Sequence, residues 1–230
     1  MTTWHVYPTL SASMPFQMAL DEILFRSEIK TVPMLRFYFA SEPWITVGYS
    51  HRSENAPVLS GDSQWPVCRR MTGGGLVIHG DDLIFSLNAR SDHDESFRSV
   101  RVSYLKIHEA VKWGLENLGN KIRFYRCDEN LPRGEECFRF PIATDLAMDE
   151  QKIAGGAQKR SMGRFLHQES MQPNNKIQPE ELMRAVSSGF ETIFKISLVK
   201  ADLHPKILYE AEKLANLKYR KKVPQNHERV

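Results

Sequence analysis

The fold is decided by one stretch of the sequence, Arg69-Arg70-Met71-Thr72-Gly73-Gly74-Gly75-Leu76-Val77-Ile78-His79. Three successive glycines allow the backbone to approach a ligand closely, and the apolar run that follows them predicts a strand. The stretch has neither the Gly-Lys-Ser/Thr of a P-loop nor the G-x-G-x-x-G of a dinucleotide site. A glycine-rich hairpin turn is the simplest interpretation, but the adjacent arginine pair favours a site for an anion or an acyl carbonyl.

The sequence on both sides of this loop predicts a strand-rich first half behind one helix. Ser13 and Pro15 supply helix start signals, and apolar residues at helical spacing follow them. Aromatic and β-branched residues predict strands at residues 34–38, 44–49, 67–70, 76–79 and 83–87.

The second half predicts three helices. An apolar stripe from Tyr104 to Leu118 ends at Gly119, a usual C-terminal signal. After a turn predicted at Gly155-Gly156, helices are expected at residues 182–194 and 207–217, each entered through a proline. The tail, residues 220–230, shows no apolar periodicity and is expected to be poorly ordered. We expect a single domain over residues 1–230.

Composition narrows the functional classes. The chain has 230 residues, 41% of them hydrophobic and 26% charged, which is typical of a globular domain with one core. Its 31 basic residues nearly match its 28 acidic ones, so nucleic-acid binding is not indicated, whereas a carrier protein with an acidic face would suit. The sequence contains neither a leader pattern nor a run of about 20 apolar residues. We expect a soluble, cytoplasmic protein that does not bind membranes.

Cysteines and histidines give no sign of a metal site. Cys68, Cys127 and Cys137 are an odd number without C-x-x-C spacing, so neither a disulfide framework nor a zinc knuckle is expected. Whether one of these thiols is a nucleophile stays open. His93, His108 and His204 show no spacing to carboxylates that suggests metal ligation.

The glycine stretch, followed by Asp82-Leu83-x-Phe85-Ser86, resembles the signature of the superfamily of lipoate ligases, octanoyltransferases and biotin ligases. Matching motifs occur in the order of that family across residues 14 to 170, which makes the resemblance far more specific than one loop. These motifs are Ala19-Leu20-Asp21-Glu22, Arg36-Phe37-Tyr38, Trp44 to Gly48, and Lys152-Ile153-Ala154-Gly155-Gly156-Ala157-Gln158-Lys159-Arg160.

The resemblance implies an α+β fold with a mixed, largely antiparallel β-sheet covered by helices, and a tunnel for a linear acyl chain beneath the glycine loop. Biotin ligases fit less well, since Thr72 and the glycine triplet stand where their Gly-Arg-Gly-Arg-x-Gly-Arg-x-Trp loop is expected. His167-Gln168-Glu169-Ser170 also departs from the expected His-Gly-Ser ending, and Glu169 in place of glycine leaves the loop geometry there open.

Two chemistries remain within the family. A free acid must first be activated as an acyl adenylate, so a ligase requires ATP and magnesium. An acyl group held as a thioester is already activated, because a protein thiolate exchanges with it almost isoenergetically, and no cofactor is needed. The segment Cys137-Phe138-x-x-Pro141, with Asp145-Leu146 and the Lys152 motif, resembles the cysteine-dependent octanoyltransferases, in which this cysteine carries the acyl group.

The resemblance therefore implies catalytic roles for Cys137 and Lys152, with Lys152 at the acyl carbonyl and offsetting Glu135 and Glu136 beside the thiol. Buried packing is the alternative for the cysteine, and an exposed lysine without a role is the alternative for Lys152. Substrate or adenylate binding is expected of Arg70, Thr72, Gly73, Gly74, Gly75, Leu76, Val77, Ile78, His79, Gly155, Gly156 and Ala157. His79 is expected only to support the loop, and Cys68 and Cys127 are interpreted as structural.

The sequence thus favours an acyltransferase with acyl carrier protein as the donor. The acceptor would be a lipoyl-domain protein, the glycine cleavage H protein or a dehydrogenase E2 subunit, and the enzyme itself a monomer. One alternative is an ATP-dependent lipoate ligase with Arg70 and Lys152 cradling the adenylate. The other is a non-catalytic acyl- or carrier-binding module. Octanoate or lipoate preference, and the identity of the carrier, stay open.

Overall fold

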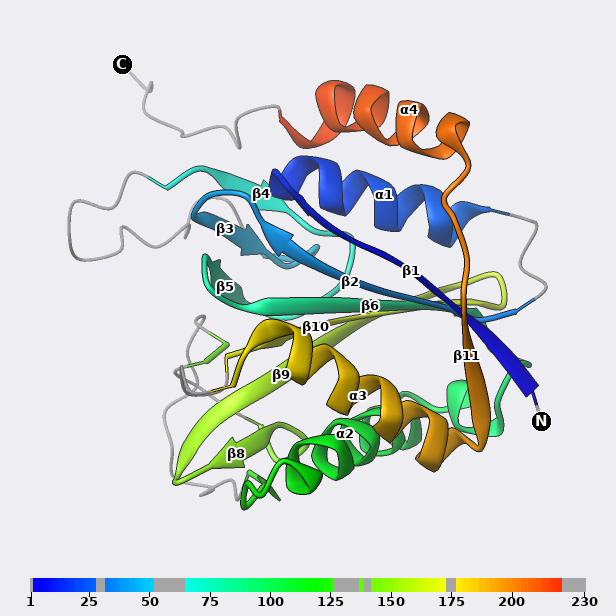
Figure 1. Cartoon of the computed structure of the whole chain (residues 1–230). Helices are drawn as coiled ribbons and strands as arrows, with labels where there is room; N and C mark the ends of the chain where they lie inside the picture. The colour runs from blue at the N-terminus through cyan, green and yellow to red at the C-terminus, as the bar shows by residue number, and fades with distance from the viewer. Residues whose placement is uncertain are drawn as a thin grey trace.

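The computed structural model describes residues 2–27, 32–51, 65–125, 137–138, 142–172 and 177–220. Strands and helices alternate irregularly along the chain, and Figure 1 shows them as layers. The strands are β1 (Thr2–Ala12), β2 (Met34–Ala40), β3 (Trp44–Val47), β4 (Val67–Arg69), β5 (Leu76–His79), β6 (Leu83–Arg90), β7 (Arg123–Phe124), β8 (Leu146–Met148), β9 (Gln151–Ser161), β10 (Arg164–Met171) and β11 (Ile196–Lys200). The helices are α1 (Met14–Arg26), η2 (Glu95–Arg98), α2 (Val100–Asn117), α3 (Pro179–Phe194), α4 (Pro205–Leu214) and η3 (Ala215–Tyr219).

The main sheet has eight strands in the order β11-β1-β2-β6-β10-β9-β8-β7. Strand β1 pairs in parallel with β11 and β2, and every other neighbouring pair in this sheet is antiparallel. A small second sheet, β4-β3-β5, carries the glycine loop between β4 and β5. The expected α+β fold with a mixed, largely antiparallel sheet is confirmed.

Helices cover both faces of the large sheet (Figure 1). Helices α2 and α3 lie on one face, and α1 and α4 lie on the other. Two hydrophobic clusters match these layers: one joins α2 and α3 to the sheet around Trp4, Phe85 and Phe190, and the other joins α1 and α4 around Leu20 and Tyr38. Within the described residues, no helix is long and apolar enough to cross a membrane.

Helices α2 and α3 touch through two glycines. A β-carbon on Gly114 would lie 2.2 Å from the carbonyl oxygen of Ala185, and one on Gly189 would lie 1.9 Å from the carbonyl oxygen of Ala110. Both distances are far below van der Waals contact, so any side chain at either glycine would push the helices apart. Close backbone packing of these helices therefore fixes the layer that carries His108.

Two local predictions are wrong. Gly155 and Gly156, expected in a turn, lie inside β9, and the turn to β10 is made by Met162 and Gly163, whose φ values are 52° and 71°. Glycine is required within the strand because a β-carbon at Gly155 would lie 2.4 Å from Nζ of Lys152. The expected loop containing Glu169 is part of β10. Of the tail predicted to be poorly ordered, Arg220 follows η3 and residues 221–230 lie outside the described residues.

Candidate active site

A cavity of about 230 Å³ lies beneath the glycine loop. Its polar lining includes Arg70, Cys137 and Lys152, and its apolar lining includes Met14 and Met18 of α1. The two residues predicted as catalytic therefore line one cavity, although 15 residues separate them in sequence. An amphipathic hollow of this kind suits a ligand with a reactive polar end and an apolar chain.

The glycine loop is closed tightly on strand β3. A β-carbon on Gly48 would lie 1.9 Å from the carbonyl oxygen of Gly74, so the two backbones are in direct contact. Gly74 has a φ of 84°, a conformation that side chains rarely adopt. Glycine is thus favoured at position 74 by its positive φ and required at position 48 by the close approach of the two backbones.

Arg70 is buried and donates mainly to its own loop. Its Nη2 atom lies 2.7 Å from the carbonyl oxygen of Gly73 and 2.9 Å from that of Gly75, and its Nη1 atom lies 3.2 Å from the Thr46 carbonyl oxygen. Burial lowers the pKa of Arg70, and the electrostatic interaction and hydrogen bond with the sulfur of Cys137 oppose this. The guanidinium therefore shapes the loop and lies beside the sulfur of Cys137.

Cys137 is attached to the strand that follows the glycines. Its backbone N–H donates to the carbonyl oxygen of Leu76 at 2.8 Å, and its side chain is half-buried. A β-carbon on Gly74 would lie 3.7 Å from the sulfur and 2.9 Å from a guanidinium nitrogen of Arg70. A partly accessible thiol next to a fixed cation is the usual environment of a reactive cysteine.

The ammonium of Lys152 is held at two points. It lies 2.7 Å from Oδ2 of Asp145 and donates to the carbonyl oxygen of Cys137 at 2.9 Å. The side chains of Lys152 and Asp145 are only 5% and 4% exposed. Burial raises the pKa of Asp145 above its ordinary value. The Lys152 charge and the hydrogen bonds from Lys152 and the Ile142 N–H act in the opposite direction but do not outweigh burial. Asp145, present in a quoted motif but not predicted as a site residue, thus fixes the lysine.

A buried polar network attaches the glycine loop to the sheet. The hydroxyl of Thr72 donates to Gln168 at 2.8 Å, and the amide of Gln168 donates to Asp21 at 2.7 Å. Arg36 and Ser86 each donate to the same aspartate at 2.6 Å. Asp21 and Arg36 belong to the motifs in the first helix and second strand, which therefore support the loop from below.

His79 lies in a second network at the end of the cavity. Its Nδ1 atom lies 2.7 Å from Asp82, its Nε2 atom lies 2.8 Å from the hydroxyl of Thr46, and Ser170 donates to Asp82 at 2.6 Å. Burial alone would raise the pKa of Asp82, but the charge of His79 and the hydrogen bonds from His79 and Ser170 outweigh burial. The pKa of Asp82 is therefore below its ordinary value. The position of His79 agrees with its predicted supporting role.

The predicted binding residues divide into two groups. Ten predicted site residues line the cavity: Arg70, Gly74, Gly75, Val77, His79, Cys137, Lys152, Gly155, Gly156 and Ala157. The other four do not line it: Thr72, Gly73, Leu76 and Ile78. Leu76 instead packs against Ile45 and Val47. Alternation along β5 explains why Val77 and His79 line the cavity whereas Leu76 and Ile78 do not, because successive side chains of a strand point to opposite faces.

The other two cysteines were predicted to be structural. Cys68 is fully buried, and burial raises the pKa of its thiol to about 12, so it stays protonated. Cys127 lies outside the described residues.

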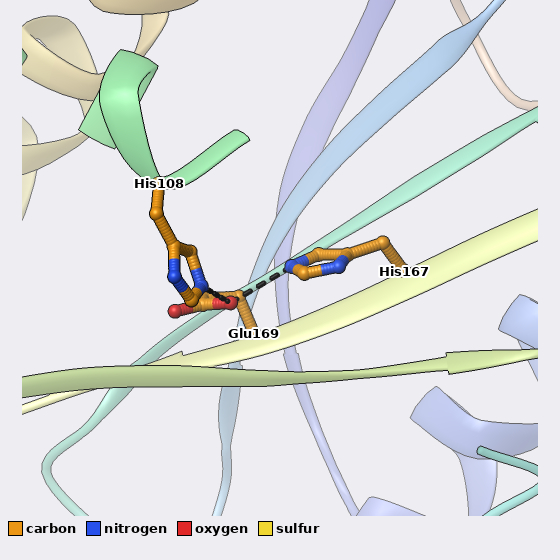
Figure 2. A group of neighbouring side chains, drawn as sticks. All are labelled: His108, His167 and Glu169. Atoms are coloured by element: carbon orange, nitrogen blue, oxygen red, sulfur yellow. Dashed lines mark hydrogen bonds and ion pairs between the residues drawn. The ribbon is translucent and has the colours of Figure 1, made fainter. Parts of the chain in front are cut away.

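His108, whose spacing in the sequence indicates no carboxylate neighbour, has one in the fold. His108 of α2 meets His167 and Glu169 of β10 in a fully buried group, with the two imidazoles converging on one carboxylate oxygen (Figure 2). The partners are 59 and 61 residues away from His108, so no local spacing could show them. Only the pairing of the sheet layer with α2 brings them together.

The α+β fold thus holds a thiol and a lysine in one cavity beneath a triple-glycine loop. Residues 13–200 match the family described as the lipoyl protein ligase A/B catalytic domain. The chain belongs to this family.

Curated relatives and solved structures agree with this membership. Octanoyltransferase LipM of Bacillus anthracis is 30% identical, with 95% of this chain and 96% of the relative covered. LipM of Bacillus subtilis is 29% identical, with 94% and 95% covered. The putative lipoate protein ligase Ta0514 of T. acidophilum has a TM-score of 0.78 at 23% identity, with 95% and 96% covered. A lipoate-protein ligase A bound with ATP has a TM-score of 0.75 at 21% identity, with 94% and 95% covered.

Proposed function

We propose that this protein is an octanoyltransferase that moves a medium-chain acyl group from a carrier thioester to a lysine of a lipoyl-domain protein, with Cys137 as the nucleophile. The supporting observation is that the thiol of Cys137 lies beside Arg70 in the same cavity as the ammonium of Lys152. The names of the LipM relatives support octanoyl transfer.

The first step exchanges one thioester for another. The Cys137 thiolate attacks the acyl carbon, a C–S bond to the enzyme forms, and the C–S bond to the phosphopantetheine arm breaks. The departing thiolate takes up a proton and leaves with acyl carrier protein, which we propose as the donor. Because both states are thioesters, this step needs no nucleotide.

The second step forms the amide. The lysine nitrogen of the lipoyl domain attacks the same carbon, the bond to Cys137 sulfur breaks, and the amine proton passes to the released thiolate. Lys152 uses two of its three N–H donors on Asp145 and the Cys137 carbonyl. We assign the third to the acyl carbonyl oxygen, where a fixed positive charge stabilises the developing oxyanion.

Arg70 supports this assignment over an adenylate-forming one. Its guanidinium donates to three backbone carbonyl oxygens and one hydroxyl of the loop and β3. Those donors are therefore used internally, within the loop and β3. The acceptor in this proposal is the glycine cleavage H protein or a dehydrogenase E2 lipoyl domain, and the enzyme acts as a monomer.

The test is an assay without nucleotide. Purified enzyme is incubated with octanoyl carrier protein and a lipoyl domain, and the product is followed by mass spectrometry. We expect octanoylation of one lysine without ATP, and an octanoyl adduct on Cys137 when the acceptor is left out. Cys137→Ser abolishes both, whereas Cys68→Ala serves as the matched cysteine control.

Two results would overturn the proposal. Product that forms only with ATP and free acid identifies a ligase, and binding of the octanoyl carrier without product under either condition identifies a non-catalytic module. Full transfer by Cys137→Ser rejects the nucleophile.

A further inference from the structure

Next to the active-site cavity, which Glu169 also lines, a histidine, a glutamate and a second histidine form a buried group. His108 projects from α2, and His167 and Glu169 project from the same face of β10. The Nε2 atoms of His108 and His167 lie 3.0 Å and 2.8 Å from the same oxygen of Glu169, as Figure 2 shows. All three side chains are fully buried.

The neighbours of His108 determine its protonation. Its Nδ1 atom faces the backbone carbonyl oxygen of Thr144, and its Nε2 atom faces the carboxylate of Glu169. Both neighbours are acceptors only, so both ring nitrogens carry hydrogens. His108 is therefore an imidazolium.

His167 is assigned by its amide neighbour. The oxygen of Gln158 accepts from Ser103 and Arg160, each at 3.1 Å, so the amide NH₂ faces Nδ1 of His167 at 3.3 Å. That nitrogen accepts, and the proton of the ring lies on Nε2, which donates to Glu169. His167 is therefore neutral, and neither histidine offers the carboxylate side an unprotonated nitrogen of the kind a metal ion requires.

One cation and one anion are thus buried together with a neutral partner. Burial tends to raise the pKa of Glu169, but the charge of His108 and the hydrogen bonds of both histidines lower it to about 2. For His108 the charge and hydrogen bond of Glu169 outweigh burial and raise its pKa, whereas burial lowers that of His167. A buried ion pair is weak evidence for stability, which suggests a role in positioning.

The group is connected to the active site through one turn. His108 binds the carbonyl oxygen of Thr144, the residue directly before Asp145. The N–H of Asp145 donates to the carbonyl oxygen of Ile142 at 2.9 Å, which closes the turn, and the carboxylate of Asp145 lies 2.7 Å from Lys152. The path from Glu169 to the lysine therefore consists of hydrogen bonds and one peptide unit.

We propose that Glu169 and protonated His108 form a charged clamp that positions the Asp145 turn, and through it Lys152, so that loss of the His108 proton releases the turn. His108 and Glu169 are positioning residues in this proposal. It rests on the proposed function, because the lysine is placed for acyl transfer.

In the part of the chain that the structure describes, titratable groups face His108 from three elements. Glu169 and His167 face it from β10, Asp145 faces it from the turn, and Tyr104 lies one turn earlier on its own helix. Burial raises the pKa of Tyr104, so its phenol stays neutral. Among these described neighbours Glu169 is the carboxylate in direct contact with the ring, and its removal is the sharpest test.

The first variant is Glu169→Gln, which keeps the shape and an acceptor oxygen but removes the charge. In NMR titrations of histidine-labelled protein, the His108 pKa should fall by about one to three units, the usual effect of one neighbouring opposite charge. The alkaline limb of kcat should move to lower pH by the same amount, with the KM for the acyl donor unchanged. Glu116→Gln, on the exposed face of α2 next to Lys112, is the matched control.

The second variant is the double change His108→Asn with Glu169→Gln. An asparagine amide can donate to the Thr144 carbonyl from the place of Nδ1, and it does not titrate. At pH 8 we expect the double variant to have a higher kcat than Glu169→Gln alone. The alkaline limb of its kcat profile, which we assign to His108, should be absent. A purely structural role predicts no such recovery.

The NMR signals of the backbone amides of residues 142–145 test the clamp independently of the proposed function, because they can be followed without any substrate. They should titrate with His108 in the wild-type protein and not in the double variant. Three results would each overturn the clamp. The first is amide signals that do not titrate with His108, and the second is a pH profile of kcat for Glu169→Gln equal to that of wild type. The third is a stoichiometric metal ion bound at His108, His167 and Glu169. Absence of acyl transfer with normal amide titration would reject the proposed function instead, and the clamp would then be a feature of the fold.

Discussion

The ammonium of Lys152 lies 2.9 Å from the backbone carbonyl oxygen of Cys137. The cation is therefore attached to the main chain of Cys137, the proposed nucleophile, and Asp145 holds it from the other side. One side chain thus contributes charge to the cavity and fixes the local path of the chain around Cys137.

Replacing Lys152 with methionine, which keeps the length but removes the charge, should lower kcat for octanoyl transfer by about 100-fold or more. This is the usual effect of removing one donor that stabilises an oxyanion. The KM for octanoyl carrier protein should change little, because the contact strengthens in the transition state. Steady-state kinetics test this, with Lys112→Met as an exposed control. Activity within twofold of wild type would refute the assigned role.

Arg70→Gln should loosen the glycine loop and slow the chemistry of the thiol. The substitution leaves carbonyl oxygens of Gly73 and Gly75 without their charged donor, which costs about 1.5–3 kcal/mol for each such bond. The midpoint of urea unfolding should fall accordingly. Alkylation of Cys137 by iodoacetamide, read by peptide mass spectrometry, should also slow because the adjacent cation is gone. An unchanged alkylation rate would show that Arg70 serves the fold alone.

The charged group around Glu169 should make stability fall in acid. The folded pKa of Glu169 is about 2 against an ordinary 4.5, so the unfolded chain binds the proton more tightly. Its contribution is fully present above about pH 4.5 and is lost as the pH falls toward 2, an amount of about 3 kcal/mol. Urea unfolding of wild type and Glu169→Gln at pH 6 and pH 3 checks this. The difference in unfolding free energy between the two proteins should shrink at pH 3; a constant difference contradicts the assignment.

Gly189→Ala should destabilise the protein although alanine is the better helix former. Propensity alone favours alanine by about 1 kcal/mol, but the new methyl group would meet the Ala110 carbonyl oxygen at 1.9 Å. Overpacking of this kind costs about 1–3 kcal/mol, and the thermal midpoint should fall. Gly80→Ala is the control, since nothing lies within 4 Å of a β-carbon there. A higher midpoint for Gly189→Ala would show that the two helices separate without cost.

The sequence predicted much of the fold, because long apolar patterns define helices such as α2 and α3 and the motif order places the glycine loop on a sheet. It missed β1, whose alternation is broken by a shift in register between Tyr7 and Leu10. It also misplaced Gly155 and Gly156 in a turn, because a glycine pair in a sequence usually indicates a turn. The side chains that lie against these two glycines in the strand can be known only from the structure.

The site was predicted in part for a similar reason. Cys137 and Lys152 belong to recognisable motifs, and both line the cavity. The partner of the lysine, Asp145, and the association of His108 with Glu169 depend on contacts between distant elements, which no spacing in the sequence encodes. Their roles in catalysis stay predictions until the variants are measured.

Strand β9 has one consequence for how this enzyme can change over evolutionary time. Gly155 leaves space for Lys152 and Asp145, and Gly156 leaves space for Glu169 and His167. A side chain at Gly155 would therefore displace the lysine and its partner, and one at Gly156 would displace the buried carboxylate and its histidine. Lineages of this protein should accordingly diversify in the surrounding side chains and retain glycine at these two positions.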